Sequence, residues 1–373
     1  MKVMTVVGTR PELIRLSRVI AKLESSCEHV LVHTGQNYDP MLNEVFLSEL
    51  GIPKPTVQFE PDRSSLGSFL GSVLQKTEAA ILEHRPNVLL VLGDTNSCLA
   101  ALMARRMGVT VFHMEAGNRC WDLAVPEETN RRVVDHVSDF NLVYTEHARR
   151  NLLREGMHAR NVYVTGSPMR EVLDFYLPKI RESTVLADRG LTKQNYVLAS
   201  LHREESVDKP DVLADLLAGL ERISTEHDCD VLISTHPRTR KRLDLLGVKP
   251  SKRLVFSEPF GFFDYNALQM AAKCVISDSG TISEESIMLG FPAVTPRNAI
   301  ERPESLDGGG PILCGTKPDA LVDAVRHVLR ADGIVSSTPP EYAVGNTSER
   351  VVRLITGLSY LRRRWDGLDE LAN

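Results

Sequence analysis

The chain has 373 residues, 42% hydrophobic and 25% charged, a composition typical of a globular protein long enough for two compact domains. Its formal net charge of -5 gives no basic field for nucleic acid or a membrane surface. With no run approaching the roughly 18 apolar residues of a membrane span and no secretory-type N-terminus, we expect a cytoplasmic protein. The six cysteines include no CxxC pair and predict individually packed thiols rather than disulfides or a metal site.

The first 165 residues alternate short apolar runs with amphipathic segments. Continuous β-branched runs predict strands buried on both faces, and the stripe of leucines and isoleucines over residues 11–23 predicts a helix with Pro11 in its first turn. This order predicts a βαβ series and a parallel sheet. The predicted strands are 3–7, 29–33, 88–92, 109–113, 140–144 and 162–165.

A polar, helix-rich stretch near residues 169–193 separates this series from a second one, with predicted strands at 196–201, 231–235, 254–257, 274–277 and 293–295. We therefore expect an α/β protein of two Rossmann-like, doubly wound domains, residues 1–172 and 173–348, facing a central cleft. The terminal segment 349–373, helical in pattern from Glu349 to Arg364, could pack on either domain.

Small or charged residues follow almost every predicted strand. Helix caps and turns explain the Thr, Ser, Asp and Gly, but not the added Arg, His and Glu, which are costly to bury without partners. The sequence 278–285 indicates a phosphate site, because Gly280 allows close approach and Ser279 precedes a helix N-terminus. Glu284 or Glu285 could bind ribose hydroxyls or complete a capping box. Both GxGxxG and the P-loop are missing, which favours another kind of nucleotide site.

Cations occur in the first turn of each series, Arg10 and Arg15 in one and His202 and Arg203 in the other. Arginine forks suit diphosphate oxygens, although surface ion pairs would explain each residue equally well. Carboxylates gather in the first series, as proton transfer at a sugar carbon would need, while Glu128 and Arg132 could simply form a helix pair. These acids are Asp94, Glu115, Asp122, Glu127 and Glu128. The basic runs that begin at His236 and at Arg362 are interpreted as mostly solvated faces, without the stacking aromatics of a nucleic-acid site.

Ten motifs follow one another between Gly8 and Glu304: GTRPE, HTGQNYD, GDTNS, HMEAGNR, VPEETNRR, VTGSP, HREES, THPR, DSGTISEE and ERPE. This ordered set resembles the non-hydrolysing UDP-N-acetylglucosamine 2-epimerase family. The resemblance implies a glycosyltransferase-B-type architecture, a UDP-sugar substrate, a homodimer, and inversion at C2 by elimination and re-addition of UDP through a 2-acetamidoglycal. It implies no nicotinamide and no metal.

Carried over by motif, Asp94, Glu115 and Glu127 match the acids of C2 proton transfer and elimination, and His202 matches a catalytic or phosphate-binding histidine. Arg10 and Arg15 would contact phosphate or sugar, with Arg15 standing where most relatives have lysine. The remaining matches are Ser279 and Gly280 to the diphosphate loop, Glu285 to the ribose carboxylate, and Arg302 and His236 to the substrate-binding surface.

The particular residues within these motifs look like those of one branch of the family. That branch forms UDP-N-acetyl-L-fucosamine from UDP-2-acetamido-2,6-dideoxy-L-talose, for surface polysaccharide synthesis. A UDP-GlcNAc/UDP-ManNAc epimerase is the nearest alternative. Gln36 and the residues after it replace the QHR-type segment associated with a second, activating UDP-sugar, and Thr281 replaces the second glycine of DSGG. A UDP-sugar-dependent glycosyltransferase, a hydrolysing epimerase and a regulatory binding protein are the rival classes, and the number of acids favours the epimerase.

Overall fold

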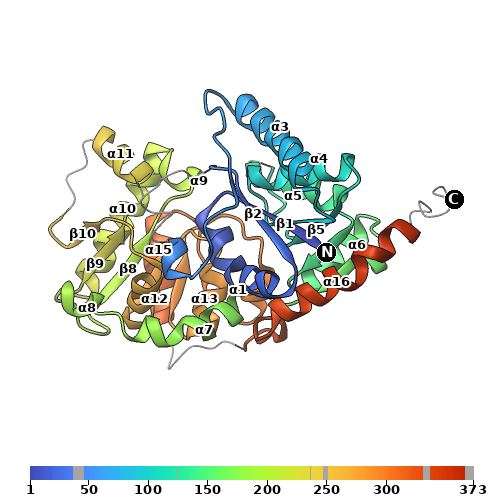
Figure 1. The fold of residues 1–373 in the computed structure, drawn as a ribbon. Coiled ribbons are helices and arrows are strands. Elements are labelled where there is room, and N and C mark those ends of the chain that lie inside the picture. Colours follow the sequence, from blue (N-terminus) through green and yellow to red (C-terminus); the bar gives the residue numbers. More distant parts are fainter. Residues whose placement is uncertain (37–45, 124, 236, 247–250, 331–336, 366–373) are drawn as a thin grey trace. The chain divides into compact units, whose positions relative to one another are not determined.

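The computed structural model describes residues 1–36, 46–123, 125–235, 237–246, 251–330 and 337–365 (Figure 1). The chain divides into two compact units: unit 1 is Met1–Asp174 with Pro340–Asn373, and unit 2 is Phe175–Pro339. In the described ranges no helix is both long enough and apolar enough to cross a membrane. All six cysteines are free, as predicted.

Unit 1 contains a seven-stranded sheet in the order β3-β2-β1-β4-β5-β6-β7, in which every strand pairs parallel with its neighbours. Its central strands are buried along their whole length because helices cover both faces. The strands are β1 (Lys2–Val7), β2 (Glu28–His33), β3 (Val57–Gln58), β4 (Val88–Leu92), β5 (Thr110–Met114), β6 (Phe140–Val143) and β7 (Val162–Val164).

The helices of unit 1 include one from the far end of the chain. Helix α16 (Thr347–Trp365, red in Figure 1) packs along α1 (Arg10–Ser26, blue), so the terminal helix belongs to unit 1. The segment before it also belongs there, because the amide of Ser167 donates to the carbonyl of Glu341 (3.1 Å). The other helices are α3 (Leu66–His84), α4 (Ala100–Arg106), α5 (Pro126–Val137), α6 (Glu146–Arg154) and α7 (Met169–Arg181), which continues into unit 2, with short 3₁₀ turns η1 (Asn96–Leu99), η2 (Ala159–Asn161) and η3 (Pro340–Tyr342).

Unit 2 contains a six-stranded parallel sheet in the order β10-β9-β8-β11-β12-β13. Its core is formed by apolar side chains of β8, β9 and β11 against helices α10 and α15. The strands are β8 (Tyr196–Ser200), β9 (Asp230–Ser234), β10 (Leu254–Ser257), β11 (Cys274–Ser277), β12 (Ala293–Thr295) and β13 (Ile312–Leu313). The helices are α8 (Val185–Asp188), α9 (Glu204–Val207), α10 (Pro210–Glu226), α11 (Pro237–Leu246), α12 (Phe262–Ala271), α13 (Ile282–Leu289), α14 (Pro303–Asp307) and α15 (Pro318–Arg330).

The predicted fold class of two parallel-sheet α/β domains is confirmed. The sequence reading missed β3 and β13, two-residue edge strands too short to carry a periodic pattern. The interpretation of the run beginning at Arg362 as a solvated face was wrong for that residue. Arg362 is buried, and its Nε lies 3.1 Å from Asp139, because α16 presses this face against the sheet.

Candidate functional site

Five of the predicted site residues follow strands at or next to the point where each sheet changes winding direction. In unit 1 the order of strands reverses between β1 and β4, and in unit 2 it reverses between β8 and β11. Ligands of doubly wound sheets bind outside the carboxyl ends of the strands at such points. Arg10, Asp94 and Glu115 follow β1, β4 and β5, whereas His202 and Ser279 follow β8 and β11.

Asp94 is held by Arg131, a residue that the sequence did not single out. The Nε and Nη2 of Arg131, on the buried face of α5, lie 2.8 and 2.7 Å from Asp94 Oδ2. Asn130 donates to the Asp94 carbonyl (2.9 Å), so two consecutive residues of α5 fix the loop after β4. Arg131 also contacts the fully buried Glu128 (2.9 Å), and hydrogen bonds from Cys120 and this ion pair lower the pKa of Glu128 against the opposing effect of burial.

Glu115 is buried and paired with Arg15 of α1, whose Nη1 lies 2.5 Å from Glu115 Oε2. Its φ of 62° is left-handed, a conformation costly for a residue with a Cβ, and it turns the carboxylate across the end of β4 beside Gly93. Arg15, which we expected to contact phosphate or sugar, forms an ion pair with Glu115.

A buried aspartate supports the loop that carries Glu115. Asp135 of α5 accepts hydrogen bonds from the Gly117 amide (3.1 Å) and from Arg119 Nη1 (2.7 Å), and its Oδ1 lies 2.9 Å from His113 Nδ1. Because the loop is anchored on both sides, the strained backbone at Glu115 is held in place.

The turn after β1 is a tight polar cluster built on Glu12. The amides of Gly8 and Thr9 donate to Glu12 Oε2 (2.8 and 2.7 Å), and the Thr95 hydroxyl donates to Oε1 (2.9 Å). Burial raises the pKa of Glu12 despite these bonds. A side chain at Gly8 would collide with Ser97, since its Cβ would stand 1.9 Å from the hydroxyl oxygen. Glu12 thus joins the turns after β1 and β4 into one surface.

Two further predicted residues of unit 1 lie in this region. Arg10 begins α1, half-buried, with its guanidinium carbon 5.4 Å from the centre of the Phe46 ring. Glu127 lies in the first turn of α5, half-buried and one turn before Arg131. The structure thus joins Asp94 to Arg131 and Glu115 to Arg15, with Glu127 on the helix that holds Asp94.

In unit 2 the turn after β8 is built on Asp278. This fully buried carboxylate accepts the amides of His202 and Arg203 (3.0 Å each to Oδ2), and His202 Nδ1 lies 3.0 Å from Oδ1. Burial alone would raise the pKa of Asp278, but His202 and the Arg203 amide lower it to about 2. The His202 side chain is 41% exposed. The structural role of Asp278 was not foreseen.

The loop between β11 and α13 is narrow at Gly280. Arg203 donates to the Asp278 carbonyl (2.8 Å) and to Glu301 Oε1 (3.1 Å). A Cβ on Gly280 would stand 3.1 Å from that Glu301 oxygen, so glycine keeps the loop against these groups. Ser279 is half-buried and its hydroxyl accepts the Thr281 amide (3.3 Å). Backbone and guanidinium donors therefore gather at one end of the sheet.

The two glutamates at the start of α13 have different partners. Glu284 is buried against Arg302, whose Nη1 lies 2.9 Å from its carboxylate, so it is not the capping-box partner that sequence spacing allowed. Glu285 accepts a hydrogen bond from Gln269 (2.8 Å). Arg302 is 1% exposed. His236 lies outside the described residues, and across the described ranges no three His, Cys, Asp or Glu side chains are grouped as metal ligands would be.

Two parallel sheets with polar switch points are typical of proteins that bind nucleotides. The family model for UDP-N-acetylglucosamine 2-epimerase matches residues 21–356. The chain is 41% identical to the solved UDP-N-acetylglucosamine 2-epimerase from Rickettsia bellii, with a TM-score of 0.90 over 97% of this chain and 98% of that one. The chain belongs to the non-hydrolysing UDP-N-acetylglucosamine 2-epimerase family and is an isomerase of that class.

Two other relatives differ in the substrate their names state. The UDP-GlcNAc 2-epimerase from Methanocaldococcus jannaschii, solved in complex with UDP-GlcNAc and UDP, is 34% identical with a TM-score of 0.90 over 95% of this chain and 99% of that one. The UDP-2,3-diacetamido-2,3-dideoxy-D-glucuronate 2-epimerase of Pseudomonas aeruginosa is 32% identical over 363 residues, 96% of this chain and 100% of that one. Relatives 34% and 32% identical to this chain thus bear the names of different sugars.

Proposed function

We propose that this protein epimerises C2 of a UDP-N-acetylhexosamine without consuming it, by eliminating UDP to a 2-acetamidoglycal and adding it back. The substrate pair is UDP-2-acetamido-2,6-dideoxy-L-talose and UDP-N-acetyl-L-fucosamine, a precursor for bacterial surface polysaccharide. The observation that carries the proposal is the pair of arginine-held acids, Asp94 and Glu115, at adjacent strand ends of a chain in this family.

The proposal assigns proton transfer to unit 1. Asp94, Glu115 and Glu127 remove the C2 proton and return one to the opposite face, which requires acids in different protonation states. The two acids differ in burial: the Glu115 side chain is 9% exposed beside Arg15, whereas the Asp94 side chain is 27% exposed beside Arg131. Arg10 contacts the phosphate or the sugar near this turn.

The proposal assigns the leaving diphosphate to unit 2. His202, with its Nδ1 on Asp278, donates from Nε2 to a phosphate oxygen when its ring carries both protons, and Arg203 and the amides after Ser279 add further donors. Glu285 accepts from the ribose hydroxyls, while Arg302 and His236 complete the substrate-binding set. No nicotinamide and no metal takes part, and we expect the working enzyme to be a cytoplasmic homodimer, whose mass light scattering will give.

Proton NMR in deuterated buffer tests the proposal. UDP-2-acetamido-2,6-dideoxy-L-talose is given in one tube and UDP-GlcNAc in another. We expect deuterium at C2 of the L-sugar, a second epimer and a constant total of UDP-sugar. Exchange confined to UDP-GlcNAc would replace the proposed substrate with the general 2-epimerase pair, which the names of the relatives favour. Steady release of UDP would indicate a hydrolysing epimerase, and exchange in neither tube would favour a glycosyltransferase.

A further inference from the structure

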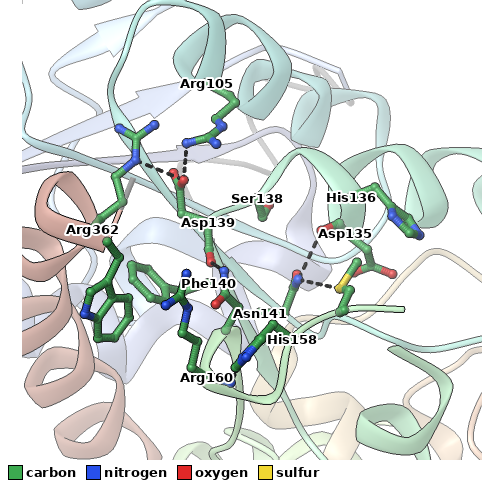
Figure 2. A pocket seen from close by; sticks show the side chains of 13 residues that line it. Arg105, Asp135, His136, Ser138, Asp139, Phe140, Asn141, His158, Arg160 and Arg362 are labelled. Atoms are coloured by element: carbon green, nitrogen blue, oxygen red, sulfur yellow. Dashed lines mark hydrogen bonds and ion pairs between the residues drawn. The ribbon is translucent and has the colours of Figure 1, made fainter. Parts of the chain in front are cut away.

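A polar cavity of about 250 Å³ lies in unit 1 and has no part in the proposed reaction. Its walls include the residues that enter β6 and β7, at the amino ends of these strands, whereas Asp94 and Glu115 follow the carboxyl ends of β4 and β5. The end of α4 and the last turn of α16 complete the cavity (Figure 2).

The lining of this cavity carries more positive than negative charge. Three arginines line it against two aspartates. Arg105 and Arg362 converge on Asp139, as Figure 2 shows. The other aspartate, Asp135, is already paired with Arg119, which lies outside the lining (2.7 Å). An anion entering the cavity therefore meets a net positive wall.

Arg160 is the arginine best placed for a ligand. It is exposed, and among the residues the structure describes no carboxylate pairs with it. Its guanidinium carbon lies 5.1 Å from the centre of the Trp365 ring, and that ring packs edge-on against Phe140 with centroids 6.1 Å apart. Stacking on an indole fixes the plane of a guanidinium and leaves the N–H groups at its edge available to an acceptor.

A histidine on the same segment supplies a second donor. The backbone amide of Arg160 donates to Nδ1 of His158 (3.1 Å). A neutral imidazole that accepts at Nδ1 carries its proton on Nε2. His158 is exposed and also lines the cavity, so Nε2–H and the Arg160 fork are two donors from adjoining positions.

We propose that this cavity binds a phosphate or phosphomonoester dianion, held by Arg160 and His158 against Trp365. Paired donors on a planar fork match the oxygens of a phosphate. A volume of about 250 Å³ is below the roughly 300–1,000 Å³ of pockets for drug-sized ligands, which suits a small anion better than a complete nucleotide sugar.

The two tryptophans of the chain allow a direct test. In a Trp121→Phe background Trp365 is the sole indole emitter. The full-length protein, with saturating UDP, is titrated with inorganic phosphate and separately with glucose 1-phosphate, sodium chloride keeping the ionic strength constant. We expect a saturable fluorescence change in both titrations. Tighter binding of glucose 1-phosphate would identify a phosphomonoester as the ligand, and equal binding would identify the free anion.

Arg160→Gln and Arg106→Gln form the matched pair of variants, since Arg106 is exposed and does not line the cavity. Loss of one charge-assisted contact should weaken phosphate binding by about tenfold or more in Arg160→Gln and leave Arg106→Gln unchanged. Isothermal titration of both variants gives a readout independent of the indole, and circular dichroism checks the fold. A response without saturation, an equal response to chloride, or equal phosphate affinity in the two variants would overturn the proposal.

Discussion

The switch points of the two sheets have the same strand topology. In one of them arginines support carboxylates, and in the other a carboxylate supports cationic residues. In unit 1 the carboxylates of Asp94 and Glu115 lie at the strand ends and arginines from α5 and α1 support them. In unit 2 the carboxylate of Asp278 is fully buried and supports the exposed His202 and the Arg203 turn. A sheet edge that presents acids suits proton transfer, and one that presents cations and amides suits an anion. In the proposed reaction the two edges therefore differ in the charge that supports them: arginines lie behind the acids of unit 1, and a carboxylate lies behind the cations of unit 2.

The largest expected effect comes from removing a proposed catalytic acid of unit 1. Glu115→Gln should slow C2 hydrogen exchange by about 10²–10⁴-fold, because the side chain keeps its shape and loses its proton-transfer capacity. Affinity for UDP should stay within about tenfold, since the proposed diphosphate donors belong to unit 2. Exchange is followed by NMR and UDP binding by calorimetry. Glu146→Gln, an exposed acid of α6, is the control, and equal losses of rate and affinity in Glu115→Gln would contradict the assignment.

Removing a support of unit 1 tests whether arginines position its acids. Arg131→Gln should lower kcat by about 10²-fold with little change in KM, because Asp94 loses the guanidinium that orients it. The neighbouring Arg132 is 44% exposed and pairs with Glu128 but not with Asp94. Arg132→Gln should therefore change kcat by less than about threefold. Steady-state kinetics of the pair decides the point. A similar effect in both variants would show that Arg131 acts through overall stability.

Removing a cationic residue of unit 2 should lower the affinity for UDP and not the rate of C2 proton transfer. Arg203→Gln should raise the dissociation constant of UDP by about 10–100-fold, the loss of one or two charge-assisted hydrogen bonds. Arg222→Gln removes an exposed guanidinium of α10 that pairs with Asp319 and should leave UDP affinity unchanged. Calorimetry with UDP measures both. Unaltered affinity in Arg203→Gln would remove this residue from the diphosphate site.

The smallest expected effect concerns the free energy of unfolding in acid. The two units should lose stability over different pH ranges. Burial lowers the pKa of His33 to about 4 from an ordinary 6.5, so the unfolded chain takes up the proton first. Stability from neutral His33 is complete above pH 6.5 and is lost as the pH falls towards 4, by about 1 kcal/mol between pH 7 and 5.5. Asp278, with its pKa lowered to about 2, loses its contribution only between about pH 4 and 2.

Urea unfolding at pH 7 and 5.5 measures the first window. His33→Gln should reduce the pH dependence there, because glutamine does not titrate, while His29 and His227, whose pKa values burial also lowers, keep the remainder. The control His84→Gln on α3 should have a smaller effect on the slope than His33→Gln. An unchanged slope in His33→Gln would assign the acid sensitivity to another group.

Much of the fold was predictable because its signals are local. Buried parallel strands need continuous β-branched runs, and the strands at 88–92, 254–257, 274–277 and 293–295 match the structure residue for residue. The glycine of the loop at 278–281 was also readable, since close backbone approach leaves only glycine acceptable. Cap chemistry was less certain: sequence spacing offered Glu284 as a capping partner, and the structure pairs it with Arg302.

The sequence by itself determined the order of strands and helices, the polar clusters at strand ends and the resemblance to the epimerase family, because these depend on residues a few positions apart. Tertiary structure alone decided the partners. Asp94 and Arg131 are 37 positions apart, and Arg362 reaches the carbonyl of Gly108 across 254. Such pairs depend on which strands become neighbours and on where the last helix packs, and hydrophobic periodicity specifies which face of an element is buried, not the charge that lies opposite.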